Sequence, residues 1–169
     1  MMRKTTLRAA FSAALCLCLA LGPTGCKREK IDDENLKIPR LMVETRGQSY
    51  GGSGEVVRLP VSGSTIPIQT TPAVNEFEIR NVELVKVEMG MALLIQTTDL
   101  GARALYRATV TNMGGRIVLT INGNAVGARR IDGAISDGNL YTFVEVPEED
   151  LGQLVLDIRE TIAHLQTKK

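Results

Sequence analysis

The chain has 169 residues, a formal net charge of +1 and 44% hydrophobic residues, which suits one globular domain with an ordinary core. It contains no tryptophan and only 4% aromatic residues, so the core must be built from aliphatic side chains. A nearly neutral charge balance gives no basis for nucleic-acid binding, which uses a strongly basic surface. We therefore expect no nucleic-acid partner.

Residues 1–25 have the three parts of an export signal. A short basic start is followed by an unbroken apolar run, Ala9 to Leu21, which is too short to span a bilayer as a mature helix. Small residues then precede Cys26. This start resembles a bacterial lipoprotein signal peptide, in which the acylated cysteine becomes the new amino terminus. Pro23 departs from the leucine expected three residues before that cysteine.

The cysteine count supports lipidation at Cys26. Cys16 and Cys18 lie inside the apolar run and would leave with the signal, so one cysteine remains and no internal disulfide can form. The alternative is a plain secretory signal cleaved near Gly25, which leaves Cys26 as a free thiol. The lipoprotein resemblance implies a membrane-anchored protein of the bacterial cell envelope. Lys27 after the cysteine favours the outer membrane, facing the periplasm, by resemblance to enterobacterial sorting.

Residues 26–54 are expected to form a flexible tether. They are charged without clear periodicity up to Arg46 and rich in glycine and serine from Gly47 to Gly54. Residues 55–76 are an extended lead-in, with two short extended pieces about a turn at Ser62 to Ser64. Pro60 and Pro67 restrict these pieces to sheet edges, because proline has no N–H for a central ladder.

Residues 77–169 are expected to form the folded domain. A strand over 77–88 loses its alternation near Asn81, which predicts a bulge, and a second strand covers 91–97. A helix is expected to start at Asp99 as its cap and to end at the glycines near Gly114. Residues 116–121 alternate as a strand with one buried face. Asn122-Gly123 then predicts a type I′ hairpin turn leading into a strand that ends near Arg130.

The last part of the chain adds a strand over 140–146 and a final helix that opens at Pro147. Three acidic residues follow the proline and suit the positive end of the helix dipole. Apolar residues then recur at helical spacing, so one face of this helix is expected to be buried. The elements together predict an α+β fold, a two-layer sandwich of mainly antiparallel sheet with two helices on one face.

The segment from Gly101 to Arg130 resembles the periplasmic head subdomain of SecD, an accessory subunit of bacterial protein export. The features that carry the resemblance are Gly101-Ala102, Thr109, Asn112, Gly114, Asn122-Gly123, Ala128 and the segment from Gly133 to Gly138. The resemblance covers roughly Met89 to Leu165. Arg129 stands where that family usually has proline. The resemblance implies the head fold and contact with extended polypeptide or an envelope protein, and it does not imply translocase activity.

The sequence offers few groups for catalysis or metal binding. His164 is the only histidine and lies near the end of the last helix, where a cation complements the dipole. One histidine and one acylated cysteine cannot assemble a metal cluster, and no cofactor motif is present. Four arginines, Arg103, Arg107, Arg129 and Arg130, are candidates for binding an acidic partner. A solvated outer face is the alternative interpretation of these arginines.

These observations predict a non-catalytic cell-envelope lipoprotein with a SecD-head-like domain for protein or peptide contact. We expect no enzymatic activity, no metal and no cofactor. The alternative hypothesis is a small envelope hydrolase or an inhibitor of one, in which Arg129, Arg130 and the loop from Gly133 to Gly138 line the site. An exposed sheet edge or apolar groove would favour peptide contact. A pocket with strongly perturbed carboxyl groups would favour the hydrolase.

Overall fold

The structure is a computed structural model that describes residues 36–45 and 54–167. The chain divides into two units, 1–30 and 31–169, and all the described residues belong to the second. The expected signal peptide and Cys26 therefore lie outside the described residues.

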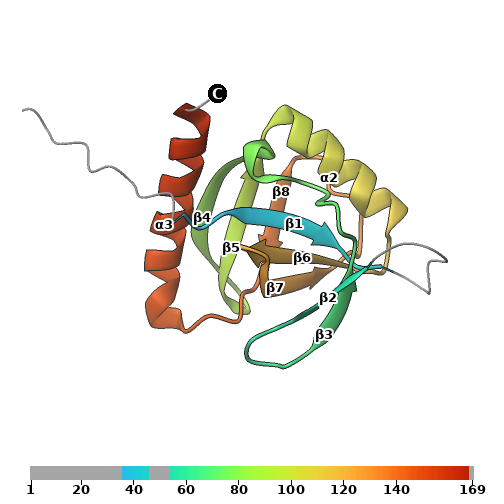
Figure 1. The fold of residues 1–169 in the computed structure, drawn as a ribbon, viewed down its shortest axis with the longest axis horizontal. Coiled ribbons are helices and arrows are strands. Elements are labelled where there is room, and N and C mark those ends of the chain that lie inside the picture. Colours follow the sequence, from blue (N-terminus) through green and yellow to red (C-terminus); the bar gives the residue numbers. More distant parts are fainter. Residues whose placement is uncertain (1–35, 46–53, 168–169) are drawn as a thin grey trace, which may run out of the picture. The chain divides into compact units, whose positions relative to one another are not determined.

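The described residues form an α+β fold in which all strand pairs are antiparallel (Figure 1). Two helices accompany the strands, so the expected fold class is confirmed, and the strands are distributed over three sheets with orders β1-β6-β7, β2-β3 and β4-β5-β8. The elements are β1 (Pro39–Val43), β2 (Glu55–Arg58), β3 (Thr65–Ile68), η3 (Glu76–Glu78, a short 3-10 helix), β4 (Ile79–Val87), β5 (Gly90–Thr97), α2 (Asp99–Thr111), β6 (Arg116–Ile121), β7 (Asn124–Arg130), β8 (Asn139–Thr142) and α3 (Glu148–Thr167).

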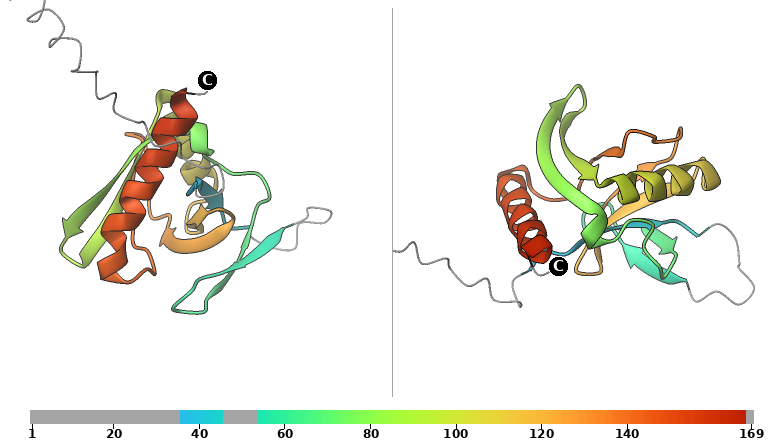
Figure 2. Two further views of the ribbon diagram at one scale, coloured as in Figure 1. Left: turned by 60° about the vertical axis from the view of Figure 1, so that its left-hand side comes forward. Right: turned by 90° about the horizontal axis from the view of Figure 1, so that it is seen from above.

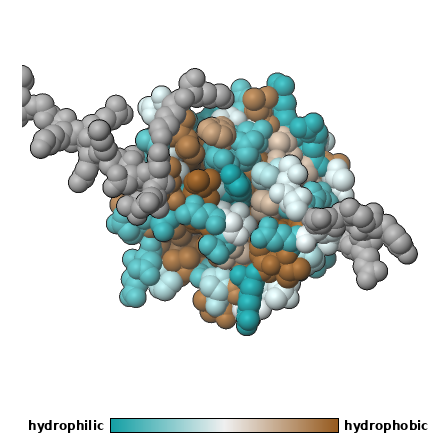
Figure 3. All heavy atoms as spheres, in the orientation of Figure 1, coloured by the Kyte–Doolittle hydropathy of each residue, from teal (hydrophilic) through white to brown (hydrophobic). Residues whose placement is uncertain are grey.

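The main core is aliphatic, as the composition requires. Helix α3 runs along β4, beside the β4–β5 hairpin, and α2 lies against β5 and η3 (Figure 2). Leu105 of α2 and Ile158 of α3 are fully buried in the same cluster as Leu93 and Ile95 of β5. Both helices therefore contribute to one core. On the face of the molecule that Figure 3 shows, hydrophobic side chains occur in separate patches among hydrophilic ones.

Strand β1 corrects the expectation of a flexible tether through this part of the chain. Residues Pro39–Val43 pair with β6 in the register Leu41↔Leu119 and Val43↔Ile117, and Leu41, Met42 and Val43 are buried. The apolar run is only three residues long and is flanked by charges. Its partner strand lies far along the chain, so the local sequence carries no signal of the pairing.

Strand β6 has the expected bounds but is buried on both faces, which corrects the expectation of one buried face. Val118 is 0% and Leu119 1% exposed, although successive residues of a strand point to opposite sides. The second face packs against the β2–β3 hairpin in a separate cluster that contains Val57, Ile66 and Ile68. This hairpin turns at Gly63, which has a φ of 67°, and it confirms the two extended pieces expected there.

The turn at Asn122-Gly123 is confirmed, with φ of 51° and 84° as a type I′ turn requires. The Asn122 side chain also hydrogen-bonds to the backbone of the segment before β1. Its Oδ1 accepts a hydrogen bond from Ile38 N at 2.8 Å, and its Nδ2 donates to Leu36 O at 2.8 Å. The turn therefore holds the segment that leads into β1.

Several boundaries differ from the sequence expectation because side chains outside the local pattern decide them. The bulge near Asn81 is confirmed by a register shift between Ile79 and Asn81. Phe77 lies in η3 and not in the strand that follows. Thr98, and not Asp99, caps α2, since its side chain accepts from Gly101 N at 3.2 Å. The last strand ends at Thr142, after which Val144 forms only an isolated bridge with Gly127.

That bridge predicts a specific sensitivity to a methyl group at Gly127. A Cβ there would collide with Phe143 O and would lie 3.0 Å from Val144 Cα. We expect Gly127→Ala to lower the free energy of unfolding by about 1–3 kcal/mol, the usual range for overpacking. Gly133→Ala is the matched control, because nothing lies within 4 Å of its Cβ. Urea denaturation measures both variants, and equal stability for the two would contradict the close packing at Gly127.

Candidate functional site

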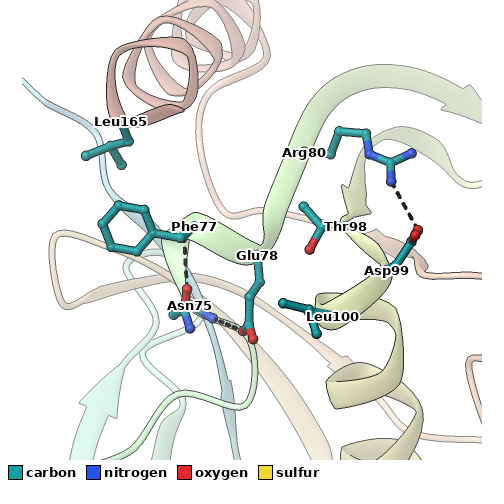
Figure 4. A pocket seen from close by; sticks show the side chains of 8 residues that line it. All are labelled: Asn75, Phe77, Glu78, Arg80, Thr98, Asp99, Leu100 and Leu165. Carbon is teal, nitrogen blue, oxygen red and sulfur yellow. Dashed lines mark hydrogen bonds and ion pairs between the residues drawn. The ribbon is translucent and has the colours of Figure 1, made fainter. Parts of the chain in front are cut away.

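Two adjoining surface depressions run along η3 and the first half of α2. They have volumes of about 800 Å³ and 730 Å³ and share Glu78 and Leu100, and we call them together the α2 groove. The first is lined by Asn75, Phe77, Glu78, Arg80, Thr98, Asp99, Leu100 and Leu165 (Figure 4). The second is lined by Glu78, Leu100, Ala102, Arg103, Tyr106, Arg107 and Ser136.

A capping box at Asn75 and Glu78 fixes the conformation of η3. Asn75 Oδ1 accepts from Phe77 N at 3.0 Å, and Glu78 Oε2 accepts from Asn75 N at 3.0 Å. Because both side chains are used to close this turn, Phe77 is held outside strand β4. Its ring lies on the side of Leu165, while Leu100 lies on the opposite side of Glu78 (Figure 4). Phe77 is 48% exposed.

Gly101 lets the start of α2 approach η3 closely. A Cβ at Gly101 would lie 2.5 Å from Glu78 O and 2.8 Å from Thr97 Cβ. Thr98 N donates a hydrogen bond to the same Glu78 O at 2.8 Å. A side chain at Gly101 would therefore separate η3 from the start of α2, the elements that bring Glu78 and Leu100 to the groove.

An ion pair links η3 to the edge strand β1. Arg40 donates from Nε to Glu76 Oε2 at 2.7 Å and from Nη2 to Glu76 Oε1 at 3.0 Å, the two-point geometry that guanidinium and carboxylate favour. These hydrogen bonds hold the pKa of Glu76 below its ordinary value, although burial opposes the shift. The Arg40 guanidinium pKa is raised by the same pair. The pair thus positions η3 relative to the β1-β6-β7 sheet.

The groove carries two arginines without a carboxylate partner among the described residues. Arg103 and Arg107 are exposed and share a helix face one turn apart, as their spacing predicts. Neither is within 4 Å of an acidic oxygen in residues 36–45 and 54–167. Arg80, by contrast, contacts Asp99 at 3.4 Å. The cationic side chains are accompanied by Leu100 and Tyr106, which are 65% and 46% exposed.

Arg129 and Arg130 lie at a different depression, so the structure does not bring the four candidate arginines together. This second site has a volume of about 540 Å³ and is lined by residues of the β4–β5 hairpin, β7 and the segment that includes β8. Arg129 Nη1 donates to Tyr141 O at 2.9 Å, and Arg130 contacts Asp132 at 3.3 Å. Both guanidinium groups therefore have partners within the chain.

Sequence reasoning missed the apolar part of the α2 groove. Phe77 was expected in a strand and Leu165 on the buried apolar face of the last helix, and Leu100 and Tyr106 were not singled out. One signal was available: Asn75 and Glu78 have the spacing of a capping box, which predicts a helical turn before β4. Leu165 could not have been found this way, since the end of α3 reaches the groove only through the tertiary fold.

The carboxyl groups with clearly shifted pKa values act as hydrogen-bond acceptors in loops and turns. Hydrogen bonds from Asn139 lower the pKa of Asp137, and burial opposes this shift. Burial of Glu145 acts to raise its pKa. Hydrogen bonds from Ser62 N and Val61 N, each at 2.8 Å, together outweigh burial, so the pKa of Glu145 is lowered. Neither residue lines the groove.

Within residues 36–45 and 54–167, no cluster of three or more His, Cys, Asp or Glu side chains has the proximity to hold a metal ion. No helix in this part of the chain combines the length and hydrophobicity that a membrane crossing needs.

The fold is similar to that of two solved structures. One is described as the crystal structure of SecDF in a super-membrane-facing form, with a TM-score of 0.55, 16% identity, and coverage of 73% of this chain and 18% of that one. The other is described as SecDF, a membrane component that enhances protein export, with a TM-score of 0.53, 16% identity, and coverage of 73% and 62%. No protein-family model and no curated protein sequence matches the chain.

The comparisons define the class of fold. The chain has the SecD-like α+β fold that the segment from Gly101 to Arg130 predicted. It corresponds to less than two thirds of either SecDF chain, and at 16% identity the similarity concerns the fold alone. What this domain binds has to be inferred from its own surface.

The lowered pKa of Glu76 predicts a pH-dependent contribution to stability. A carboxyl with a depressed folded-state pKa stabilises the fold above its unfolded value, here near 4.5, and this stabilisation is lost as the pH falls through the folded value. We expect Glu76→Gln to cost on the order of 1 kcal/mol at neutral pH, since Arg40 is partly exposed. The cost should shrink below pH 4.5.

Denaturation curves between pH 3 and 7 measure this difference, with the exposed Glu55→Gln as a control for the loss of one negative charge. A Glu76→Gln cost that does not change with pH, or equal costs for the two variants, would contradict the assignment.

Proposed function

We propose that the chain is a lipoprotein of the bacterial cell envelope whose folded domain binds protein or extended peptide without catalysing a reaction. The observation that carries the proposal is the α2 groove, an open depression with exposed Phe77, Leu100 and Tyr106 beside uncompensated arginines. Apolar side chains gathered in a concave surface favour a partner that removes them from water. The SecD-like fold supports polypeptide as that partner, since SecDF is described as enhancing protein export.

The polar groups of the groove support binding more than catalysis. Asn75 and Glu78 close the η3 turn, and Asp99 faces Arg80. A general acid or base has to be free to exchange a proton with a substrate, and its pKa is commonly moved towards neutrality. Among the described residues, Glu76, Asp137 and Glu145 have lowered pKa values instead. These features favour a binding domain over the alternative of a small hydrolase.

The proposed location rests on the first 26 residues. The basic start, the short apolar run and Cys26 support export followed by acylation. Lys27 favours the outer membrane with the domain on the periplasmic side. A single acyl chain contributes about 0.8 kcal/mol per buried CH₂, so stable anchoring needs more than one chain, as a diacylated cysteine provides.

The anchor is tested by Cys26→Ser in the full chain expressed in bacteria. We expect the parent protein to sediment with membranes and the variant to appear in the soluble fraction or as an uncleaved precursor. Cys18→Ser, within the apolar run, is the matched control and should sediment as the parent does. Mature Cys26→Ser that remains fully in the membrane fraction would argue against acylation.

Binding is tested by site-specific photocrosslinking in intact cells. A benzoylphenylalanine at Phe77 should give discrete adducts with envelope proteins, because the groove is proposed to hold polypeptide. The same group at Val56, an exposed apolar position on the β2–β3 hairpin, is the control. Identical adducts at both positions, or none at Phe77, would count against the α2 groove as the binding site.

A further inference from the structure

We propose that the α2 groove selects acidic peptide segments, in which an apolar side chain is followed two or three residues along the chain by carboxylates. This inference rests on the proposed peptide-binding function and adds the chemistry of the partner. It is carried by the division of the groove into an apolar end and a cationic end.

The apolar end lies where η3, the start of α2 and the end of α3 meet. Phe77, Leu100 and Leu165 line it from three separate elements, with Leu100 and Phe77 well exposed (Figure 4). η3 cannot relax to cover these side chains, because the Asn75–Glu78 capping box and the close contact at Gly101 hold it in place. One aliphatic or aromatic side chain of a partner would bury this apolar surface.

The cationic end is formed by Arg103 and Arg107. Residues four apart on a helix have their Cβ atoms about 5–6 Å apart, so the two guanidinium groups can bind neighbouring carboxylates. Two carboxylates line the groove: Glu78 accepts from Asn75 N, and Asp99 contacts Arg80, so neither is paired with Arg103 or Arg107. An acidic partner would therefore gain two charge-assisted contacts, whereas a basic partner would meet two like charges.

Helix geometry sets the spacing between the two ends. Arg103 and Arg107 lie about 4.5 Å and 10.5 Å beyond Leu100 along the axis, at 1.5 Å per residue. An extended peptide advances about 3.3 Å per residue, so carboxylates roughly two or three residues from the apolar side chain fall between the two arginines. This spacing distinguishes the proposed partner from a merely acidic chain.

A lipid surface is a weaker fit to the same residues. An anionic bilayer contributes only about 1 kcal/mol per basic residue near its surface, and the groove presents two uncompensated arginines. Phe77 and Leu100 also line a depression, which matches a protruding side chain better than a plane. The test therefore includes vesicles as a competing outcome.

The probe is a fluorescein-labelled serine–glycine peptide with one leucine and glutamates two and three positions after it. A matched peptide carries lysines in place of the glutamates. Fluorescence anisotropy with the purified full chain in detergent should show at least tenfold tighter binding of the acidic peptide, weakening as salt is added. The double variant Arg103→Glu, Arg107→Glu should reverse the preference towards the lysine peptide. Arg129→Glu, Arg130→Glu is the matched control and should keep the acidic preference.

Equal binding of the two peptides, an unchanged preference in the Arg103/Arg107 double variant, or no binding of either peptide would overturn the proposal. So would binding of vesicles containing phosphatidylglycerol that depends on Arg103 and Arg107 while the acidic peptide is ignored. The proposed function can fail separately: if both peptides bind equally and Phe77→Ser abolishes both, peptide binding stands and acidic selectivity does not.

Discussion

The burial of β6 on both of its faces is the constraint on which the rest of this structure depends. Leu119 faces the main core with both helices, and Val118 faces the β2–β3 hairpin in the second cluster. A strand in this position cannot slip by one residue without exchanging the two sets of side chains, so its register is strongly specified. Strands β1 and β7 pair antiparallel with β6 on its two sides, so the register of β6 also determines where they lie.

The candidate binding groove is connected to this strand by a short series of polar and close contacts. Strand β1 pairs with β6 and carries Arg40, which holds Glu76 in the first turn of η3. The end of η3 meets α2 at Gly101, where no side chain intervenes. The groove is therefore linked to the β1-β6-β7 sheet by hydrogen bonds and close packing, which favours binding through preformed shape.

Features fixed by neighbouring residues could be predicted from the sequence. The Asn122-Gly123 turn needs two positive φ angles, and the start of α3 after Pro147 follows from the geometry of a first helical turn. The shared face of Arg103 and Arg107 follows from the helical period in the same way. The SecD-like fold was also accessible, through the resemblance of the small residues and turns between Gly101 and Arg130 to those of the SecD head subdomain.

Features fixed by remote partners could not be predicted. The pairing of β1 with β6 and the second buried face of β6 depend on residues that are distant along the chain. Arg129 and Arg103 were grouped by residue type, but the fold places them at separate depressions. The apolar end of the groove needs Leu165 from α3 and Phe77 from η3 to line the same depression, an arrangement that no local pattern encodes.

The central claim is that this SecD-like domain holds polypeptide in the α2 groove. Backbone amide chemical-shift mapping of the full chain during titration with an unfolded acidic polypeptide measures this most directly. The account predicts that the largest shifts occur at residues 75–78 and 98–107. Shifts centred on Arg129, Arg130 and Tyr141, or no saturable shifts anywhere, would contradict it.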